Sequence, residues 1–172
     1  MILESFQVGE GQRPTVLLHG FLGTGRNLRS LATAWSEVDK SRRFLLLDMT
    51  GHGASPRLPP GATLATVAGD VLETARAAGL HGPLELVGHS LGGRVSLAAS
   101  LRSPADVASV ALLDISPSPI PPALSESGKV MELLRAAPPG APDRRARRAE
   151  RMGRGLSGPL SDCTRMPACC RA

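Results

Sequence analysis

Tyrosine is absent from this 172-residue sequence, and the other aromatic residues are few: three phenylalanines and one tryptophan. Cysteine is absent from residues 1–162 and occurs only at Cys163, Cys169 and Cys170. Three cysteines so close to one end provide neither a disulfide framework nor the two cysteine pairs of a zinc site. We therefore expect no metal site.

Long hydrophobic runs are also missing. No stretch of about 18 consecutive apolar residues occurs, so the sequence predicts no transmembrane helix. Residues 1–5 lack the basic region, followed by an apolar run, that marks a secretory signal. The sequence therefore predicts a cytoplasmic protein without a membrane span.

The positive charge is confined to one end of the sequence. The net charge of the chain is +5, and residues 143–172 account for all of it, because acidic and basic residues balance in residues 1–142. Clustered arginines can mark a nucleic-acid-binding surface, but no aromatic residues are interspersed among these. We interpret the cluster as the solvated face of a helix and expect no nucleic-acid partner.

Short apolar segments alternate with helical patterns along the first 113 residues. Strands are predicted at residues 2–8, 14–18, 43–48, 84–87 and 107–113. Most of these segments are continuously apolar, which is typical of strands that are buried on both faces. Their alternation with helices predicts an α/β fold, with a mostly parallel sheet and helices on both of its faces.

Three helices are predicted from apolar spacing and from capping residues. The second begins at an N-cap, Thr63, and ends at Gly79, whereas the third extends from residue 91 to about Leu101. A loop rich in glycine and proline is expected over residues 51–61. The first helix places four apolar side chains on one face at helical spacing: Leu28, Leu31, Ala32 and Trp35.

The character of the sequence changes at residue 117, where prolines become frequent. We divide the chain into a core of residues 1–116, a proline-rich, helical, lid-like segment of residues 117–155 and an irregular tail of residues 156–172. A flexible linker is an equal interpretation of the middle segment. The length is typical of one domain with a sizeable core.

The most informative feature is the G-x-S-x-G motif at residues 88–92, which joins the strand predicted at 84–87 to the third helix. A strand, a sharp turn at a serine and a helix form a nucleophile elbow. Gly88 and Gly92 lack a β-carbon, so the chain can turn tightly around Ser90. The motif predicts a strained serine whose hydroxyl lies at the positive end of a helix.

Three further elements end at the carboxyl edge of the predicted sheet, where open α/β folds bind ligands. They are residues 19–21, Asp48 with the turn at 51–53, and Asp114. If Ser90 attacks an acyl carbon, the developing oxyanion requires hydrogen-bond donors. We expect the backbone N–H groups of Leu91 and Phe21 to provide them.

Four blocks of the sequence resemble the α/β-hydrolase superfamily, and together they cover residues 14–118. The blocks are LLHGFLG at residues 17–23, LDMTGHGAS at 47–55, VGHSLGG at 87–93 and LDISP at 113–117. The last block is similar to that of small bacterial esterases akin to α/β-hydrolase domain-containing protein 11.

The resemblance implies a serine hydrolase that cleaves small-molecule carboxylic esters or thioesters without a metal or an organic cofactor. Relatives with an aspartate nucleophile are dehalogenases and epoxide hydrolases, so Ser90 argues against those reactions. The resemblance makes Asp114 the best acid of a catalytic triad, and capping of a turn is an equal interpretation. It implies that His19 is structural and that His19, Gly20 and His89 line the site. Alternation along the strand directs His89 away from the serine hydroxyl.

The expected catalytic histidine is missing from this sequence. In this fold the histidine follows the serine and the acid along the chain, but the four histidines, at positions 19, 52, 81 and 89, all precede Ser90. With the change of composition near residue 162, this predicts a C-terminally truncated chain with impaired catalysis. Two alternatives stay open: a non-catalytic protein that keeps the binding pocket, and a carbon–carbon lyase on the same scaffold.

Overall fold

The computed structural model describes residues 1–116, in which five strands form one sheet in the order β1-β3-β2-β4-β5. β1 pairs antiparallel with β3, and all other neighbouring strands pair in parallel. The mostly parallel sheet predicted from the sequence is confirmed. The strands are β1 (Ser5–Val8), β2 (Arg13–Leu18), β3 (Arg42–Leu47), β4 (Leu84–His89) and β5 (Val107–Leu113).

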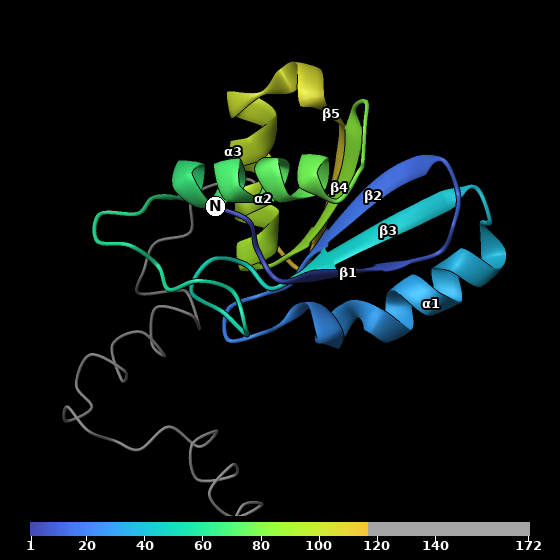
Figure 1. The fold of residues 1–172 in the computed structure, drawn as a ribbon, viewed down its shortest axis with the longest axis horizontal. Helices are drawn as coiled ribbons and strands as arrows, with labels where there is room; N and C mark the ends of the chain where they lie inside the picture. The colour runs from blue at the N-terminus through green and yellow to red at the C-terminus, as the bar shows by residue number, and fades with distance from the viewer. Residues whose placement is uncertain (117–172) are drawn as a thin grey trace, which may run out of the picture. The chain divides into compact units, whose positions relative to one another are not determined.

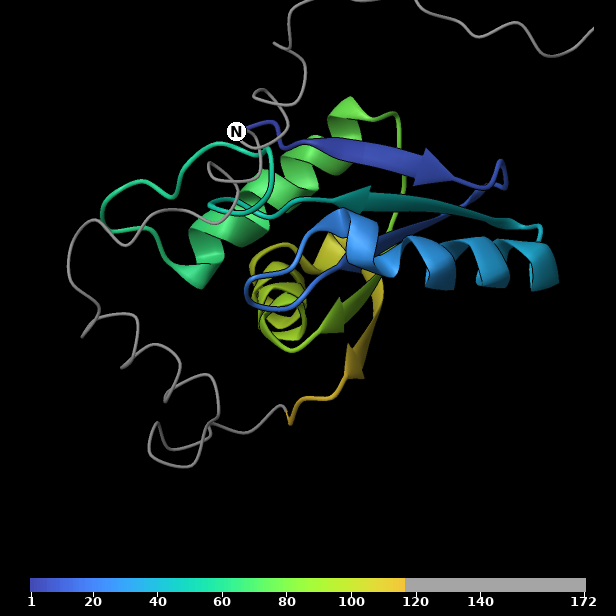
Figure 2. The ribbon, with the colours of Figure 1, turned by 90° about the horizontal axis from the view of Figure 1, so that it is seen from below.

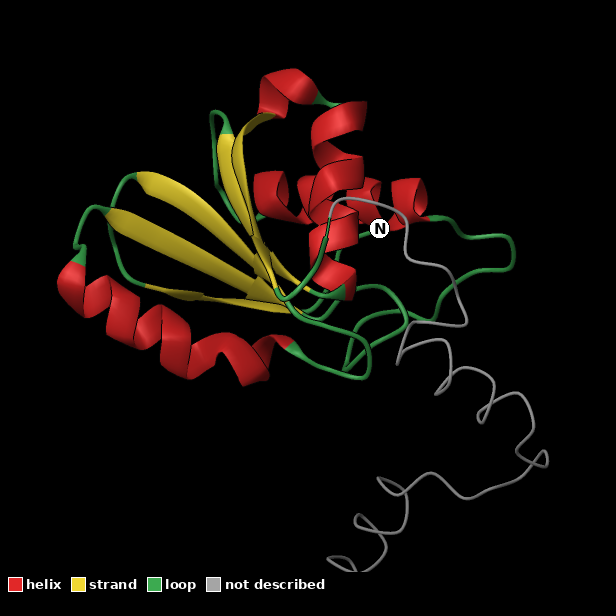
Figure 3. Ribbon diagram, turned by 180° about the vertical axis from the view of Figure 1, so that it is seen from behind, coloured by secondary structure: helices red, strands yellow, loops and turns green. Residues whose placement is uncertain are grey.

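Helices cover both faces of the sheet, as the alternation of elements predicts (Figures 1, 2 and 3). α1 (Arg29–Val38) lies on one face, and α2 (Leu64–Ala77) and α3 (Leu91–Arg102) lie on the other. Two short 3-10 turns, Gly25–Leu28 and Pro104–Asp106, precede α1 and β5. The segments expected at 117–155 and 156–172 lie outside the described residues.

Two buried clusters hold these layers together. Along β2, Val16 and Leu18 belong to the larger cluster with α2 and α3, whereas Leu17 belongs to the smaller cluster with α1. This alternation explains why the strand is apolar at every position: each of its faces is covered by a helix. In the part of the chain that the structure describes, no helix has the length and apolarity to cross a bilayer.

The three central strands end together at one edge of the sheet. Leu18 of β2 is paired in register with Leu47 of β3 and with Gly88 of β4. The residues that follow these three positions therefore emerge side by side, as the sequence predicts for the carboxyl ends of parallel strands. This edge contains the candidate active site.

The caps predicted for α2 are confirmed. Thr63 has an extended backbone, and its hydroxyl accepts a hydrogen bond from the amide of Thr66 at 3.3 Å. At the other end Gly79 has φ +76°, and its amide donates to the carbonyl of Arg76 at 3.0 Å. A glycine is the residue that adopts this left-handed conformation at least cost.

The apolar face predicted for α1 is partly wrong. Ala32 is buried and Trp35 packs on Phe44 with ring centroids 5.4 Å apart, but Leu31 is 41% exposed. Leu28, Ala32 and Trp35, at positions i, i+4 and i+7, all contact the smaller cluster. Leu31, at position i+3, lies at the margin of this face and is exposed to solvent.

β5 is apolar in sequence but exposed in the structure. It lies at the edge of the described sheet, and none of its seven residues is buried. Leu113, at its end, is 38% exposed. The apolar composition of Val107–Leu113 gives no indication of this, because composition alone does not show whether a strand has one neighbour or two.

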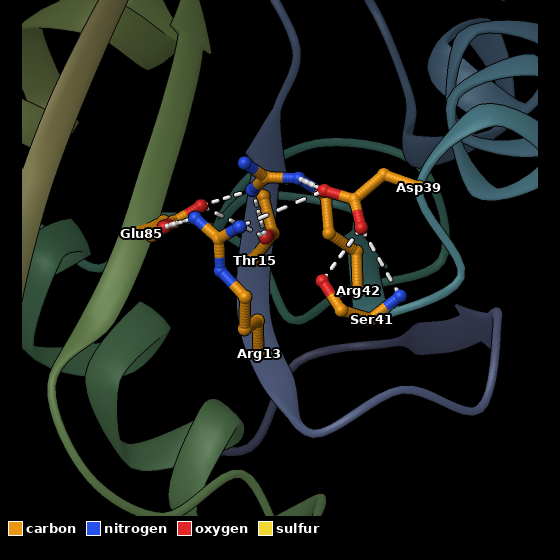
Figure 4. Close-up of polar contacts among 6 residues, drawn as sticks. All are labelled: Arg13, Thr15, Asp39, Ser41, Arg42 and Glu85. Atoms are coloured by element: carbon orange, nitrogen blue, oxygen red, sulfur yellow. Dashed lines mark hydrogen bonds and ion pairs between the residues drawn. The ribbon is translucent and has the colours of Figure 1, made fainter.

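Four charged side chains form a network at the amino-terminal ends of the central strands, at the opposite end of these strands from the candidate site (Figure 4). Arg13 donates to Glu85 at 2.6 Å, and Arg42 contacts both Glu85 and Asp39. The guanidinium of Arg42 also lies 4.6 Å from the ring centroid of Trp35. The network ties β2, β3 and β4 to the end of α1.

We predict that this network makes stability depend on acid pH. Burial raises the pKa of Glu85, but hydrogen bonds and charge from Arg13 and Arg42 outweigh burial and hold that pKa below its ordinary value. The ionised form therefore stabilises the fold fully above the ordinary glutamate pKa of about 4.3, and this stabilisation is lost as the pH falls through the folded-state pKa.

Glu85→Gln is expected to lower the free energy of unfolding by about 1 kcal/mol at pH 7. Below about pH 4.5, the free energy of unfolding of the variant should also decline less steeply than that of the parent chain. Urea denaturation between pH 3 and 7 measures both effects. Glu37→Gln, at an exposed position of α1, is the matched control. Coincident pH profiles for the parent and Glu85→Gln would contradict the prediction.

Candidate active site

The chain turns sharply at Ser90, between the end of β4 and the start of α3. Ser90 has φ +50° and ψ −112°, a conformation that costs a non-glycine residue about 1–3 kcal/mol. The turn is held from both sides: the amide of Ser90 donates to Leu113 of β5 at 3.1 Å, and its carbonyl accepts from Gly93 at 3.0 Å. The predicted order of strand, strained serine and helix is present.

The glycines of the motif are required by close packing of backbone. A β-carbon on Gly92 would overlap the carbonyl oxygen of Leu18 at the end of β2, and one on Gly88 would overlap the backbone of Gly92. The first turn of α3 therefore lies directly against β2 and β4. This close approach fixes the position of Ser90 above the edge of the sheet.

The hydroxyl of Ser90 forms no hydrogen bond with any residue in the range 1–116. The loop after β2 approaches it, because a β-carbon placed on Gly20 would lie 3.4 Å from the β-carbon of Ser90. Phe21 follows Gly20 in sequence, and Leu91 follows Ser90. Within the described part of the chain, the backbone amide of neither residue has an acceptor. Two amides that have no acceptor among residues 1–116, each next to this contact in sequence, are candidates for the stabilisation of an oxyanion.

His19 is a buried structural side chain, 1% exposed. Its Nε2 accepts a hydrogen bond from the amide of Met49 at 3.0 Å, so its Nδ1 carries the proton and donates to the carbonyl of Gly20 at 2.8 Å. Burial lowers the pKa of His19 and keeps the ring neutral. With both nitrogens engaged, His19 links the loops after β2 and β3 and is not available as a base.

His89 precedes Ser90 in sequence, and its side chain lies close to that of Asp114. The imidazole Nδ1 of His89 would be 2.7 Å from a β-carbon on Gly20, and its Nε2 is 3.8 Å from a carboxylate oxygen of Asp114. Asp114 has φ +54°, and its side chain is 90% exposed. Its role as the triad acid stays a prediction.

Asp48 holds together the loops around the site through hydrogen bonds to backbone amides. One carboxylate oxygen accepts from the amide of Gly25 at 2.8 Å, and the other accepts from that of Ala54 at 2.8 Å. Gly53, at φ +57°, lies so close that its β-carbon would overlap this carboxylate. The motif at residues 47–55 is therefore a structural turn.

A cavity of about 320 Å³ lies beside the two candidate oxyanion donors. Its walls come from the loop after β2, from residues 49–63 and from the facing surfaces of α2 and α3. We did not predict it from the sequence. The start of the α2 apolar stripe at Leu64 is a usable signal, but Leu58 lies in an irregular loop without periodicity. The lining residues are Phe21, Met49, Thr50, His52, Leu58, Ala62, Thr63, Leu64, Val67, Leu91 and Val95.

The sequence profile of the α/β hydrolase fold family matches residues 14–158. The chain belongs to this family. The assignment agrees with the strand order and with the elbow at the end of β4, and it confirms the superfamily resemblance of the sequence blocks.

Two of the relatives that match this chain carry the name of a lipase. The sn-1-specific diacylglycerol lipase ABHD11 of Danio rerio is 38% identical over 107 residues, which are 61% of this chain and 32% of that protein. The Mus musculus protein of the same name is 36% identical, over 63% of this chain and 35% of that protein. This chain spans about a third of the length of these curated relatives.

Solved structures show the same fold. A thermophilic esterase from Thermogutta terrifontis matches with a TM-score of 0.65 and 29% identity, over 80% of this chain and 50% of that one. A marine microorganism esterase matches with a TM-score of 0.69 over 91% of this chain and 59% of that one. At 24% identity, the second match supports the fold alone.

We predict that the backbone strain at Ser90 lowers the free energy of unfolding. Ser90→Gly and Ser90→Ala both remove the hydroxyl, but only glycine adopts φ +50° and ψ −112° without steric cost. Ser90→Gly should unfold with a free energy about 1 kcal/mol higher than Ser90→Ala. Chemical denaturation of the two variants measures the difference, and equal stabilities would show that the turn is not strained.

The close packing at Gly92 leads to a second prediction. Gly92→Ala should destabilise the chain by about 3 kcal/mol, because its methyl group overlaps the rigid backbone of β2. Gly69→Ala is the matched control within α2. The nearest atom to its new methyl group is 3.9 Å away, so it should stabilise the chain by up to about 1 kcal/mol. Thermal melts that shift equally for both variants would contradict this account.

Proposed function

We propose that this protein is a serine hydrolase that cleaves carboxylic esters or thioesters. Ser90 Oγ attacks the acyl carbon and forms a tetrahedral intermediate, whose oxyanion accepts hydrogen bonds from the amides of Phe21 and Leu91. Collapse of the intermediate breaks the bond to the leaving oxygen or sulfur, which takes the proton that Ser90 gives up and departs as an alcohol or a thiol, so that the acyl group remains on Ser90. Water then attacks this ester and releases the carboxylic acid.

The observation that carries the proposal is the strained backbone of Ser90, whose hydroxyl has no hydrogen bond among residues 1–116, next in the fold to a loop whose Phe21 amide also has no acceptor there. A conformation of this cost persists where surrounding structure enforces it, and such residues are concentrated at functional sites. The names of relatives point the same way, since a diacylglycerol lipase and an esterase are hydrolases of carboxylic esters. A serine at position 90, rather than an aspartate, favours ester chemistry over opening of an epoxide.

The proposed reaction needs a general base, and this chain offers no histidine in the usual position. Among the histidines of the sequence, His19 uses both ring nitrogens in structural hydrogen bonds, and none follows Ser90. We propose that Asp114 is the triad acid and that the 172-residue chain reacts slowly. An oxyanion hole and substrate binding alone leave about 10³–10⁴-fold catalysis over the uncatalysed reaction.

The cytoplasmic location of the protein also remains a prediction.

We predict that a fluorophosphonate modifies the chain once, at Ser90. Mass spectrometry should find the adduct on the peptide that contains Ser90, and Ser90→Ala should abolish it. Ser100→Ala, in the same helix, is the control and should label like the parent chain. Hydrolysis of a short-chain nitrophenyl ester should be slow but should depend on Ser90.

Labelling that persists in Ser90→Ala would contradict the proposal. Absence of any adduct after prolonged incubation would also contradict it and would favour a protein that binds ligands without catalysis.

A further inference from the structure

The side chains of His89 and Asp114 form an acid–imidazole pair beside the turn at Ser90. The Nε2 atom of His89 lies 3.8 Å from a carboxylate oxygen of Asp114. A carboxylate only accepts hydrogen bonds, so its proximity favours the tautomer of His89 with the proton on Nε2. The other ring nitrogen, Nδ1, is then the atom that can accept a proton. The side chain of His89 is 44% exposed, so water and substrate can reach it.

The Nδ1 atom of His89 and the side chain of Ser90 approach the same point of the loop after β2. A β-carbon on Gly20 would lie 2.7 Å from Nδ1 and 3.4 Å from the β-carbon of Ser90. Neighbouring side chains alternate between opposite faces only while the chain is extended, and Ser90, at φ +50°, has left the strand. Because position 20 is a glycine, the imidazole and the serine both border the space that a β-carbon would fill.

The other histidines are less suitable partners for the serine. His19 uses both ring nitrogens in structural hydrogen bonds. His81 precedes β4 and therefore lies at the opposite end of this strand from the serine. The side chain of His52 has its hydrogen bond with a backbone carbonyl. Within residues 1–116, His89 is the only histidine at ion-pair distance from an acid.

We infer that His89 is the general base of this chain and that Asp114 orients it. This inference rests on the proposed function. As Ser90 Oγ forms its bond to the acyl carbon, its proton passes to Nδ1 of His89, directly or through one water molecule. The carboxylate of Asp114 stabilises the resulting imidazolium, which returns the proton to the leaving oxygen or sulfur. A nucleophile, an adjacent base and a third group that orients the base are the three parts that activate a serine.

The rate of fluorophosphonate labelling at Ser90 tests this role. In the 172-residue chain the rate should rise between pH 5 and 8, the range in which histidine titrates, because only the neutral imidazole accepts a proton. His89→Asn should lower the rate at pH 8 by about tenfold or more and flatten this rise. His81→Asn, at an exposed position, is the matched control and should leave the rate and its pH profile unchanged. Thermal melts check that both variants fold.

Chemical rescue separates proton transfer from a structural role of His89. Added imidazole should restore part of the labelling rate of His89→Ala and should not change the rate of His81→Ala. Asp114→Asn should slow labelling less than His89→Asn. The double variant should be no slower than His89→Asn alone, because Asp114 acts through the imidazole.

The outcomes distinguish this inference from the proposed function. Equal rates and pH profiles for the parent chain and His89→Asn would retain Ser90 as the nucleophile and overturn the role of His89. Loss of the pH-dependent rate in His52→Asn, with His89→Asn unchanged, would also overturn it and would assign the base to His52. Absence of labelling in the parent chain would remove both the hydrolase and its base.

Discussion

The close contact between the first turn of α3 and the end of β2 is the constraint on which the candidate site depends. The backbone at Gly92 lies against the carbonyl of Leu18, and no side chain fits between them. The chain leaving β4 must therefore turn within one residue, and Ser90 takes the strained conformation that results. The same contact brings the loop at Gly20 against Ser90. Ser90, the proposed nucleophile, and the loop that contains Phe21, a proposed oxyanion donor, are thus positioned by close packing of backbone.

The packing that supports this contact is distributed over the sheet. β2 and β3 form its buried centre, and helices cover both of their faces. The half-buried Asp48 and the buried His19 then use hydrogen bonds to hold the loops that leave these strands. Replacing His19 would lower stability most, because the buried amide of Met49 would remain unsatisfied. The position of Asp48 and His19 near the serine thus reflects structural support and not participation in proton transfer.

Much of this arrangement could be predicted from the sequence, because local signals are strong there. The apolar strands, the Thr63 cap, the Gly79 stop and the glycines around Ser90 each have a local physical cause. The predictions failed where the outcome depends on distant parts of the chain. The exposure of Leu31 is one case, because it depends on which margin of the apolar face of α1 contacts the sheet. The cavity wall at Leu58 likewise depends on the path of an irregular loop, which no periodicity encodes.

The central claim is that the amides of Phe21 and Leu91 face the space above Ser90 in which an oxyanion would form. A crystal structure of the chain after reaction with a fluorophosphonate tests this claim most directly, because its phosphoryl oxygen occupies the oxyanion position. The account predicts a covalent bond from Ser90 to phosphorus, with that oxygen about 3 Å from both amide nitrogens. A phosphoryl oxygen directed to solvent, with either amide bonded elsewhere, would contradict it.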